Sequence, residues 1–223
     1  MFYNINNLKR LGFHPDVIID VGAYKGEWTS HVIKIFEHAK ILMIEPQRSK
    51  ETLLKNLAKL NPNILYTRAL VGDKNREKAQ FCEMETGSSI YEEQTDHPRS
   101  MTYYQMTTLN DVIDEFQLKG NYFIKLDVQG AEMDVLNGAS RLLPHTEVLL
   151  LEVSLLNYNE GAPLFAEIIG YLNSKNFVLF DICDLRRKPD DTLFQADLIF
   201  MKRNSLMREK VNFRIPTYNV LHS

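Results

Sequence analysis

Three acidic residues stand at the ends of apolar runs, where their side chains could do chemistry. Asp20, Glu45 and Asp127 each follow a short run of β-branched and other apolar residues. Such runs predict buried strands, and the ligands of open α/β sheets bind where the parallel strands end. We therefore expect the three carboxylates to lie along one sheet edge, where they can accept hydrogen bonds, attract a cation or take up a proton.

The first acidic residue belongs to the segment VIIDVGAYKG, which starts at Val17. Gly22 permits a tight turn after the strand, and Gly26 lets a ligand approach the backbone where the next helix begins and its N–H groups are unpaired. The spacing D-x-G-x-x-x-G differs from the G-x-G-x-x-G of dinucleotide enzymes. Asp20 would repel a phosphate and suits an ammonium group instead. The alternative is an ordinary strand-to-helix turn with a solvated aspartate.

Glu45 follows the second apolar run, 25 residues after Asp20, and precedes Pro46. A glutamate at the end of the second strand can accept hydrogen bonds from both ribose hydroxyls of an adenosine. NAD enzymes share this arrangement, so Glu45 indicates adenosine and does not identify the reaction. A plain surface glutamate is the alternative.

The third segment runs from Phe123 through Asp127 to Glu132. Its strand delivers Asp127 to the ligand-binding edge, and Gln129 follows at the turn. Glu132 lies in the first turn of the next helix, where it either faces the same crevice or simply stabilises the helix N-terminus.

Weaker candidates lie elsewhere in the chain. His97 stands in a polar loop over residues 85–105, where a solvated histidine is the ordinary interpretation. Tyr103 and Tyr104 can stack on a sugar or merely pack. The basic run 186–188 predicts a solvated hairpin turn, with anion binding as the alternative.

Strands and helices alternate along most of the chain and must position these residues. Apolar periodicity predicts one α/β domain with strands at 17–19, 41–44, 64–70, 78–82, 122–126, 148–153, 177–181 and 197–201, and helices at 25–38, 49–60, 108–116, 131–137 and 163–173. Residues 72–105 are less regular and include a mobile loop with Gly87. Gly138 is expected to end its helix as a C′ residue. No helix separates the last two strands, so the final strand should be antiparallel.

Composition excludes several classes of protein. A net charge of −3, with 44% hydrophobic and 25% charged residues, fits a globular chain and argues against a nucleic-acid surface as its main feature. Cys82 and Cys183 are expected to be free thiols in a reducing compartment. The N-terminus lacks the apolar region of a signal peptide, and the longest apolar runs cannot span a bilayer. We expect a cytoplasmic protein without an integral membrane segment.

These segments together resemble the FkbM-type methyltransferases, which use S-adenosylmethionine. The resemblance extends from about Pro15 to Met201 and combines motifs that are weak alone but specific in their order and spacing. The family pattern often has Glu where this chain has Gln129. The matching segments are IDVGA from Ile19, Glu45-Pro46, ALVGD from Ala69, Gly87-Ser88-Ser89, TLND from Thr108, KLDVQGAE from Lys125, VLNGA from Val135 and Leu151-Glu152-Val153.

The resemblance implies a doubly wound, Rossmann-like sheet of seven strands in the order 3-2-1-4-5-7-6, with the last strand antiparallel. It implies that Asp20 and its turn line the methionine side of the cofactor, that Glu45 binds the ribose, that residues near Leu70 or Asp73 approach the adenine, and that Asp127 lies near the transferred methyl group. The cofactor-binding candidates are Asp20, Gly22, Ala23, Tyr24, Gly26, Glu45, Pro46, Leu70, Asp73, Asp127 and Gln129.

Methyl transfer to oxygen needs a group that takes the proton of the acceptor hydroxyl. Asp127 and Glu152, at the ends of adjacent central strands, are the catalytic candidates, and His97 is a weaker third. A divalent cation held by Asp127 and Glu152 is an alternative, but no metal is expected because histidines and cysteines show no ligand spacing.

The sequence thus predicts an S-adenosylmethionine-dependent methyltransferase that acts on a hydroxyl of a sugar, glycolipid or small metabolite. Residues 1–203 are expected to form the single domain, with residues 1–14 carrying an N-terminal helix, and residues 204–223 a tail that docks on the domain or a second subunit. A homo-oligomer is compatible with this. The alternatives are an NAD-dependent Rossmann oxidoreductase and a non-catalytic module that binds an adenosine ligand.

Overall fold

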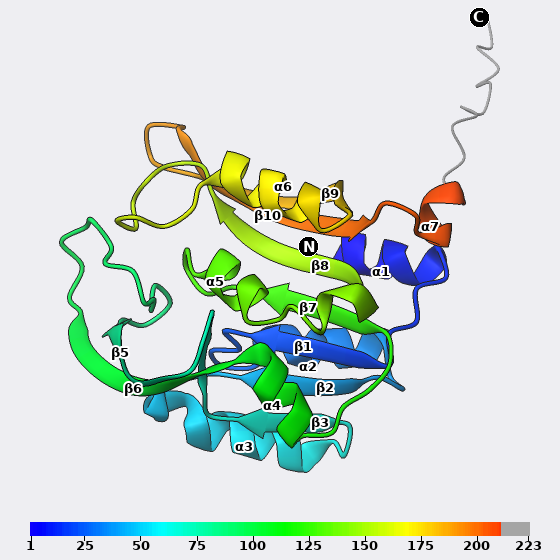
Figure 1. Ribbon diagram of the computed structural model, residues 1–223, viewed down its shortest axis with the longest axis horizontal. Helices are drawn as coiled ribbons and strands as arrows, with labels where there is room; N and C mark the ends of the chain where they lie inside the picture. Colours follow the sequence, from blue (N-terminus) through cyan, green and yellow to red (C-terminus); the bar gives the residue numbers. More distant parts are fainter. Residues whose placement is uncertain (211–223) are drawn as a thin grey trace, which may run out of the picture.

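A seven-stranded sheet lies between two layers of helices in the computed structural model, which describes residues 1–210 (Figure 1). The sheet strands are β1 (Val17–Val21), β2 (Lys40–Ile44), β3 (Ile64–Thr67), β7 (Tyr122–Leu126), β8 (Thr146–Ser154), β9 (Phe177–Arg187) and β10 (Leu193–Lys202). The helices are α1 (Phe2–Arg10), α2 (Glu27–Ile35), α3 (Glu51–Leu60), α4 (Leu109–Glu115), α5 (Glu132–Asn137), α6 (Phe165–Ser174) and α7 (Leu206–Glu209), with short 3₁₀ helices η1 (Arg48–Lys50) and η2 (Leu143–His145).

The strand order is β3-β2-β1-β7-β8-β10-β9. The first five strands in this order are parallel, and β10 is antiparallel to both β8 and β9. The sequence predicted this order and the antiparallel last strand, and both are confirmed. Because β1 and β7 are neighbours although distant in sequence, the segments that follow them meet at one edge of the sheet.

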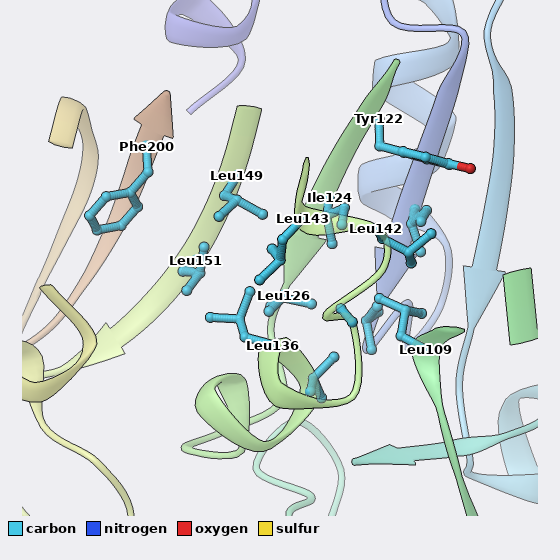
Figure 2. Packing of buried hydrophobic residues seen from close by; sticks show 14 of the residues in the cluster. Leu109, Tyr122, Ile124, Leu126, Leu136, Leu142, Leu143, Leu149, Leu151 and Phe200 are labelled. Carbon is cyan, nitrogen blue, oxygen red and sulfur yellow. The ribbon is translucent and has the colours of Figure 1, made fainter. Parts of the chain in front are cut away.

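Both faces of the sheet are buried, which explains why its central strands read as continuous apolar runs. Along β1, Ile19 faces α4, α5 and α6, whereas Ile18 faces α1, α2 and α3. Figure 2 shows the first of these clusters, in which Ile124 and Leu126 of β7 pack beside Leu149 and Leu151 of β8. The two cores fix the strands that carry the acidic residues.

A second, smaller sheet lies beside the first. It contains β4 (Leu70–Gly72), β5 (Arg76–Glu83) and β6 (Ser100–Thr108) in the order β4-β6-β5. In Figure 1 this sheet and the segment between β5 and β6 lie on the side toward which the arrowheads of β7 and β8 point. The small sheet therefore stands next to the carboxyl edge of the large one.

The small sheet corrects two predictions. The single strand predicted over 64–70 is wrong, because β3 ends at Thr67 and β4 belongs to the other sheet. The irregular segment predicted over 72–105 ends inside a nine-residue strand, β6, which runs from Ser100 to Thr108. Only Met106 of this strand is buried, so β6 carries no apolar run that would reveal it in the sequence.

Gly138 ends α5, as predicted, but without the left-handed conformation that is usual for a C′ glycine. Its φ is −73°, in the right-handed region. A Cβ at this position would lie 2.0 Å from the carbonyl oxygen of Gly72. Glycine is therefore required by the close approach of two backbones and not by a left-handed turn.

The predicted N-terminal helix is present as α1, and the start of the predicted tail forms α7. Met207 of α7 is buried in the same core as α1, and Lys210 Nζ donates a hydrogen bond of 3.0 Å to the carbonyl oxygen of Leu11. The rest of the tail prediction lies outside the described residues. None of the helices within residues 1–210 combines the length and the apolar character needed to cross a membrane.

Candidate functional site

A cavity of about 850 Å³ opens at the carboxyl edge of the large sheet. Its floor is formed by residues after β1, β2 and β7, and its roof by residues 84–98 between β5 and β6. This volume lies within the range of about 300–1,000 Å³ that is typical of small-molecule sites. The carboxyl edge is therefore open to a ligand and not filled by the protein's own side chains.

Glu45 lies directly after β2 and is 3% exposed. Its Oε2 accepts a hydrogen bond of 2.9 Å from the backbone N–H of Tyr24, and its Oε1 accepts one of 3.0 Å from the N–H of Gln47. Burial raises the pKa of Glu45, while these two N–H groups act in the opposite direction. Because each carboxylate oxygen has two lone pairs, the fixed carboxylate retains capacity to accept from hydroxyl groups of a ligand.

The turn after β1 is held by backbone contacts. Gly22 has φ +74°, and a Cβ there would lie 1.9 Å from the carbonyl oxygen of Asp127. Tyr24 also adopts a positive φ of 49° and lines the cavity. Gly26 does not line it: a Cβ there would meet Leu57 Cδ2 at 2.6 Å, so this glycine makes room for α3 and not for a ligand, which corrects the physical reason expected for it.

Asp20 is fully buried beneath the cavity floor and does not line it. Its carboxylate accepts a hydrogen bond of 2.7 Å from Thr29 Oγ1 of α2 and forms an ion pair of 3.0 Å with Lys125 Nζ. The same ammonium donates to the carbonyl oxygen of Gly22 at 3.1 Å and lies 3.5 Å from Asp127 Oδ2. Asp20 therefore fixes Lys125, and Lys125 ties the β1 turn to Asp127.

Asp127 faces the cavity with a side chain that is 35% exposed. Its Oδ1 accepts a hydrogen bond of 3.0 Å from Gln129 Nε2, which also donates to Glu152 Oε1 at 2.6 Å. Gln129 is held in turn by Tyr158, whose hydroxyl donates to Gln129 Oε1 at 2.8 Å. The amide of Gln129 thus joins the two predicted catalytic carboxylates.

Glu152 lies beneath the cavity wall, with only 2% of its side chain exposed. It accepts a hydrogen bond of 2.8 Å from Gln195 Nε2 and forms an ion pair with Arg186, whose guanidinium is also 3.9 Å from Asp197. Burial and the nearby Asp127 raise the pKa of Glu152 to about 8. Burial likewise raises the pKa of Asp197 to about 6. Among the described residues, no three His, Cys, Asp or Glu side chains are grouped to hold a metal ion.

Glu132 is buried and does not face the cavity. Its Oε1 accepts the backbone N–H groups of Val128 at 3.1 Å and Gly130 at 3.3 Å. Burial raises its pKa to about 7. Two interpretations were open for Glu132: that it faces the crevice, or that it stabilises the N-terminus of α5. These contacts agree with the second.

The roof of the cavity is anchored on both sides. On one side, Glu85 accepts hydrogen bonds from the Tyr24 hydroxyl at 2.5 Å and from Lys50 Nζ at 2.9 Å. On the other, Ser89 Oγ donates to the carbonyl oxygen of Gln129 at 2.7 Å. The roof therefore spans from the β2 end of the sheet to the β7 end.

The cavity brings together most of the residues predicted to bind a cofactor. Those that line it are Gly22, Tyr24, Glu45, Pro46, Leu70, Asp127 and Gln129, and the weaker candidate His97 lines it as well. Those that do not are Asp20, Ala23, Gly26 and Asp73, and the catalytic candidate Glu152 also lies behind the wall. Asp73 is instead paired with Arg76 at 2.7 Å. Tyr103 and Tyr104 stand on β6 and do not line the cavity.

Several site residues were missed by sequence reasoning. Lys125 stands out in the sequence as the single charge within an apolar strand, and that signal was available. Tyr158 and Gln195 lie in segments without a motif, and only the fold brings Tyr158 to Gln129 and Gln195 to Tyr158. Arg186 was interpreted as part of a solvated turn, but it lies within β9 and lines the cavity.

Comparison with one solved structure supports the fold, and a second is similar to a lesser degree. The FkbM methyltransferase of Methylobacillus flagellatus KT superposes with a TM-score of 0.55 at 18% identity and covers 83% of this chain, which corresponds to 43% of that protein. A precorrin-6y C5,15-methyltransferase of Geobacter metallireducens GS-15 gives a TM-score of 0.49 at 11% identity, over 89% of this chain and 85% of the other. No curated protein sequence matches significantly.

A family model agrees with these structures. The model described as the methyltransferase FkbM domain matches residues 20–179, which is more than half of the chain and includes Asp20, Glu45 and Asp127. The floor of the cavity and its acidic residues lie within this region. The strands of the large sheet lie within it or directly beside it. The chain belongs to the FkbM methyltransferase family.

Proposed function

We propose that the protein is an S-adenosylmethionine-dependent O-methyltransferase that acts on a hydroxyl of a sugar, glycolipid or small metabolite. The observation that carries this proposal is the placement of Glu45 and Asp127 on one cavity floor, after β2 and β7, which flank β1. The first can accept from ribose hydroxyls and the second can take the acceptor's proton.

The residues present fit this cofactor in shape and charge. Four carboxylates line the cavity, namely Glu45, Glu85, Glu93 and Asp127, against one guanidinium, Arg186. S-adenosylmethionine carries a sulfonium and an ammonium against one carboxylate, so its net positive charge suits an acidic cavity. Leu70 and Phe81 form an apolar wall that suits an adenine ring. Glu45 and Tyr24 would hold the ribose side, and Asp127 would lie near the transferred methyl group.

When bound, S-adenosylmethionine supplies a methyl group on a positively charged sulfur. The protein's own part is to position the acceptor and to take its proton. The acceptor oxygen forms the new C–O bond as the S–C bond breaks, and its proton passes to an Asp127 carboxylate oxygen. Gln129 orients this carboxylate through Oδ1, and Lys125 faces it through Oδ2.

The proposal is tested by calorimetry and turnover together. Asp127→Asn should bind S-adenosylhomocysteine within a few-fold of the unaltered protein and lose roughly 10²–10⁴-fold in methyl transfer, the range for a general base. Asp96→Asn, in the exposed part of the roof, is the matched control. Full turnover by Asp127→Asn would remove Asp127 from the mechanism.

Thermal-shift measurements separate the two alternative functions. Stabilisation by NAD but not by S-adenosylhomocysteine would indicate an oxidoreductase. Stabilisation by S-adenosylhomocysteine with no methyl transfer to any acceptor extract would indicate a binding module.

We further propose that the protein acts in the cytoplasm. Cys82 and Cys183 are both free thiols, which suits a reducing compartment.

A further inference from the structure

The proposed function assigns the part of the cavity near Glu45 to the cofactor. The part beyond Asp127 is then left for the acceptor, and the inference about it rests on that proposed function. We call this part of the cavity the acceptor half. It lies at the ends of β7, β8, β9 and β10, on the side of Asp127 away from Glu45. Its lining residues are Asp127, Gln129, Tyr158, Arg186, Phe194 and Gln195, with Glu93 from the roof, which pairs with Asn159 next to Tyr158.

The acceptor half has no cation free to bind an anion. Arg186 is the single lysine or arginine among the described residues that line the cavity. Its guanidinium contacts Glu152 and lies 3.9 Å from Asp197, and both carboxylates are at most 5% exposed. The one guanidinium is therefore already engaged by two buried carboxyl groups.

Backbone N–H groups of the loop before α5 are also occupied by the protein itself. N–H groups at the start of a helix commonly bind phosphate or carboxylate. In this loop the N–H groups of Val128 and Gly130 donate to Glu132. At the other end of the cavity the N–H groups of Tyr24 and Gln47 donate to Glu45. The protein's own carboxylates thus occupy these donors.

Carboxylates that can accept from a ligand are available by contrast. Asp127 faces the cavity, and Glu93, which is 9% exposed, lines it from the roof. Glu152 Oε2 and Asp197 Oδ2 are buried and, among the described residues, make no hydrogen bond beyond their ion-pair contacts with Arg186. The local balance of charge is negative even with Arg186 included.

We propose that the acceptor carries a protonated amine close to the methylated hydroxyl, as an amino sugar or an aromatic amino alcohol does. Its ammonium would donate to Glu93 and Asp127, and its apolar part would lie against Tyr158 and Phe194. An acceptor that bears a phosphate or a carboxylate is disfavoured, because it would meet unbalanced carboxylates without a free cation.

The test compares matched probes on the protein saturated with S-adenosylhomocysteine. One set is glucosamine, glucose, glucuronate and glucose 6-phosphate, and the other is 2-amino-1-phenylethanol against 3-hydroxy-3-phenylpropionate. Calorimetry at neutral pH should show that the amine of at least one set binds roughly tenfold or more tightly than its neutral or anionic counterparts, the gain expected from one charge-assisted hydrogen bond.

A pair of variants locates the effect. Glu93→Gln should remove most of the preference for the amine, whereas Glu92→Gln, next to it on the exposed side of the roof, should keep it. Tighter binding of the anionic probes, equal binding of all probes or no binding of either amine would overturn the inference. Binding of S-adenosylhomocysteine is measured first and tests the proposed function on its own. If the protein does not bind it, the proposed function fails. If the protein binds it, the acceptor probes test only the class of acceptor.

Discussion

Asp20 and Lys125 are direct partners in the register between β1 and β7, and their side chains form an ion pair of 3.0 Å beneath the cavity floor. Each comes from a segment that reads as an apolar strand. The pair is almost fully buried, so neither charge can be satisfied by water if the other is lost. The acidic edge is therefore built on an internal ion pair that the ligand does not touch.

Lys125→Met should destabilise the fold by about 3–5 kcal/mol, because it leaves Asp20 charged and unpaired in the interior. Urea unfolding would measure the loss. Lys119→Met, which alters an exposed lysine just before β7, is the control and should change little. The double variant Asp20→Asn with Lys125→Met should recover part of the stability, and a further loss instead would show that the pair is not the cause.

Glu45→Gln should weaken binding of S-adenosylhomocysteine about 10- to 100-fold, the value of one or two charge-assisted hydrogen bonds. The amide would also turn an NH₂ group toward one of two backbone N–H donors, those of Tyr24 and Gln47. Calorimetry measures the affinity. Glu27→Gln, on the exposed side of α2, should bind normally, and an unchanged affinity in Glu45→Gln would remove this residue from the cofactor site.

Gln129→Glu would place a third carboxylate within 3.0 Å of Asp127 and Glu152. Repulsion should then move the acidic limb of the pH–rate profile upward by about one unit or more and reduce turnover at neutral pH. Gln117→Glu is a matched control, since Gln117 also has a positive φ, 53° against 52°, but lies exposed and outside the cavity. A pH–rate profile identical to that of the unaltered protein would contradict a role for the amide.

Stability should fall as pH rises from about 5 to 8. The pKa of Glu152 is raised to about 8 in the folded protein, against 4.5 for an ordinary glutamate. Between these values the folded state binds more protons than the unfolded state, so the free energy of unfolding decreases with pH. Chemical denaturation across this range measures the slope. Glu132 and Asp197 also have raised pKa values, of about 7 and about 6, so Glu152→Gln should reduce the slope without abolishing it. An unchanged slope would assign the effect to those other groups.

The sequence predicted the sheet because its central strands are buried on both faces. Ile18 and Ile19 face opposite cores, and only a strand buried on both sides is apolar at consecutive positions. The same reasoning failed for β6, where Met106 alone is buried and the alternation carries no signal. Glu45 and Asp127 could be placed at the carboxyl edge because each directly follows such a strand.

The finer geometry of the site could not be read from the sequence. Whether a side chain at a strand end faces the cavity depends on which face of the sheet it occupies and on what lies across from it. Asp20 was expected at the ligand, but the register puts it opposite Lys125 on the α2 side. Arg186 and Glu152 come from strands that are both hydrogen-bonded to β10, and their contact depends on that shared neighbour.

Part of the cavity wall comes from beyond residue 179, where the match to the family model ends. Arg186, Phe194 and Gln195 all belong to the β9–β10 hairpin, and β9 is the outermost strand of the sheet, bonded only to β10. Replacing the tip of this hairpin would reshape one wall and leave β10 in the sheet and the strand ends that carry Glu45 and Asp127 in place. Acceptor preference can thus evolve, or be engineered, as a separable module at the rim of an otherwise constant enzyme.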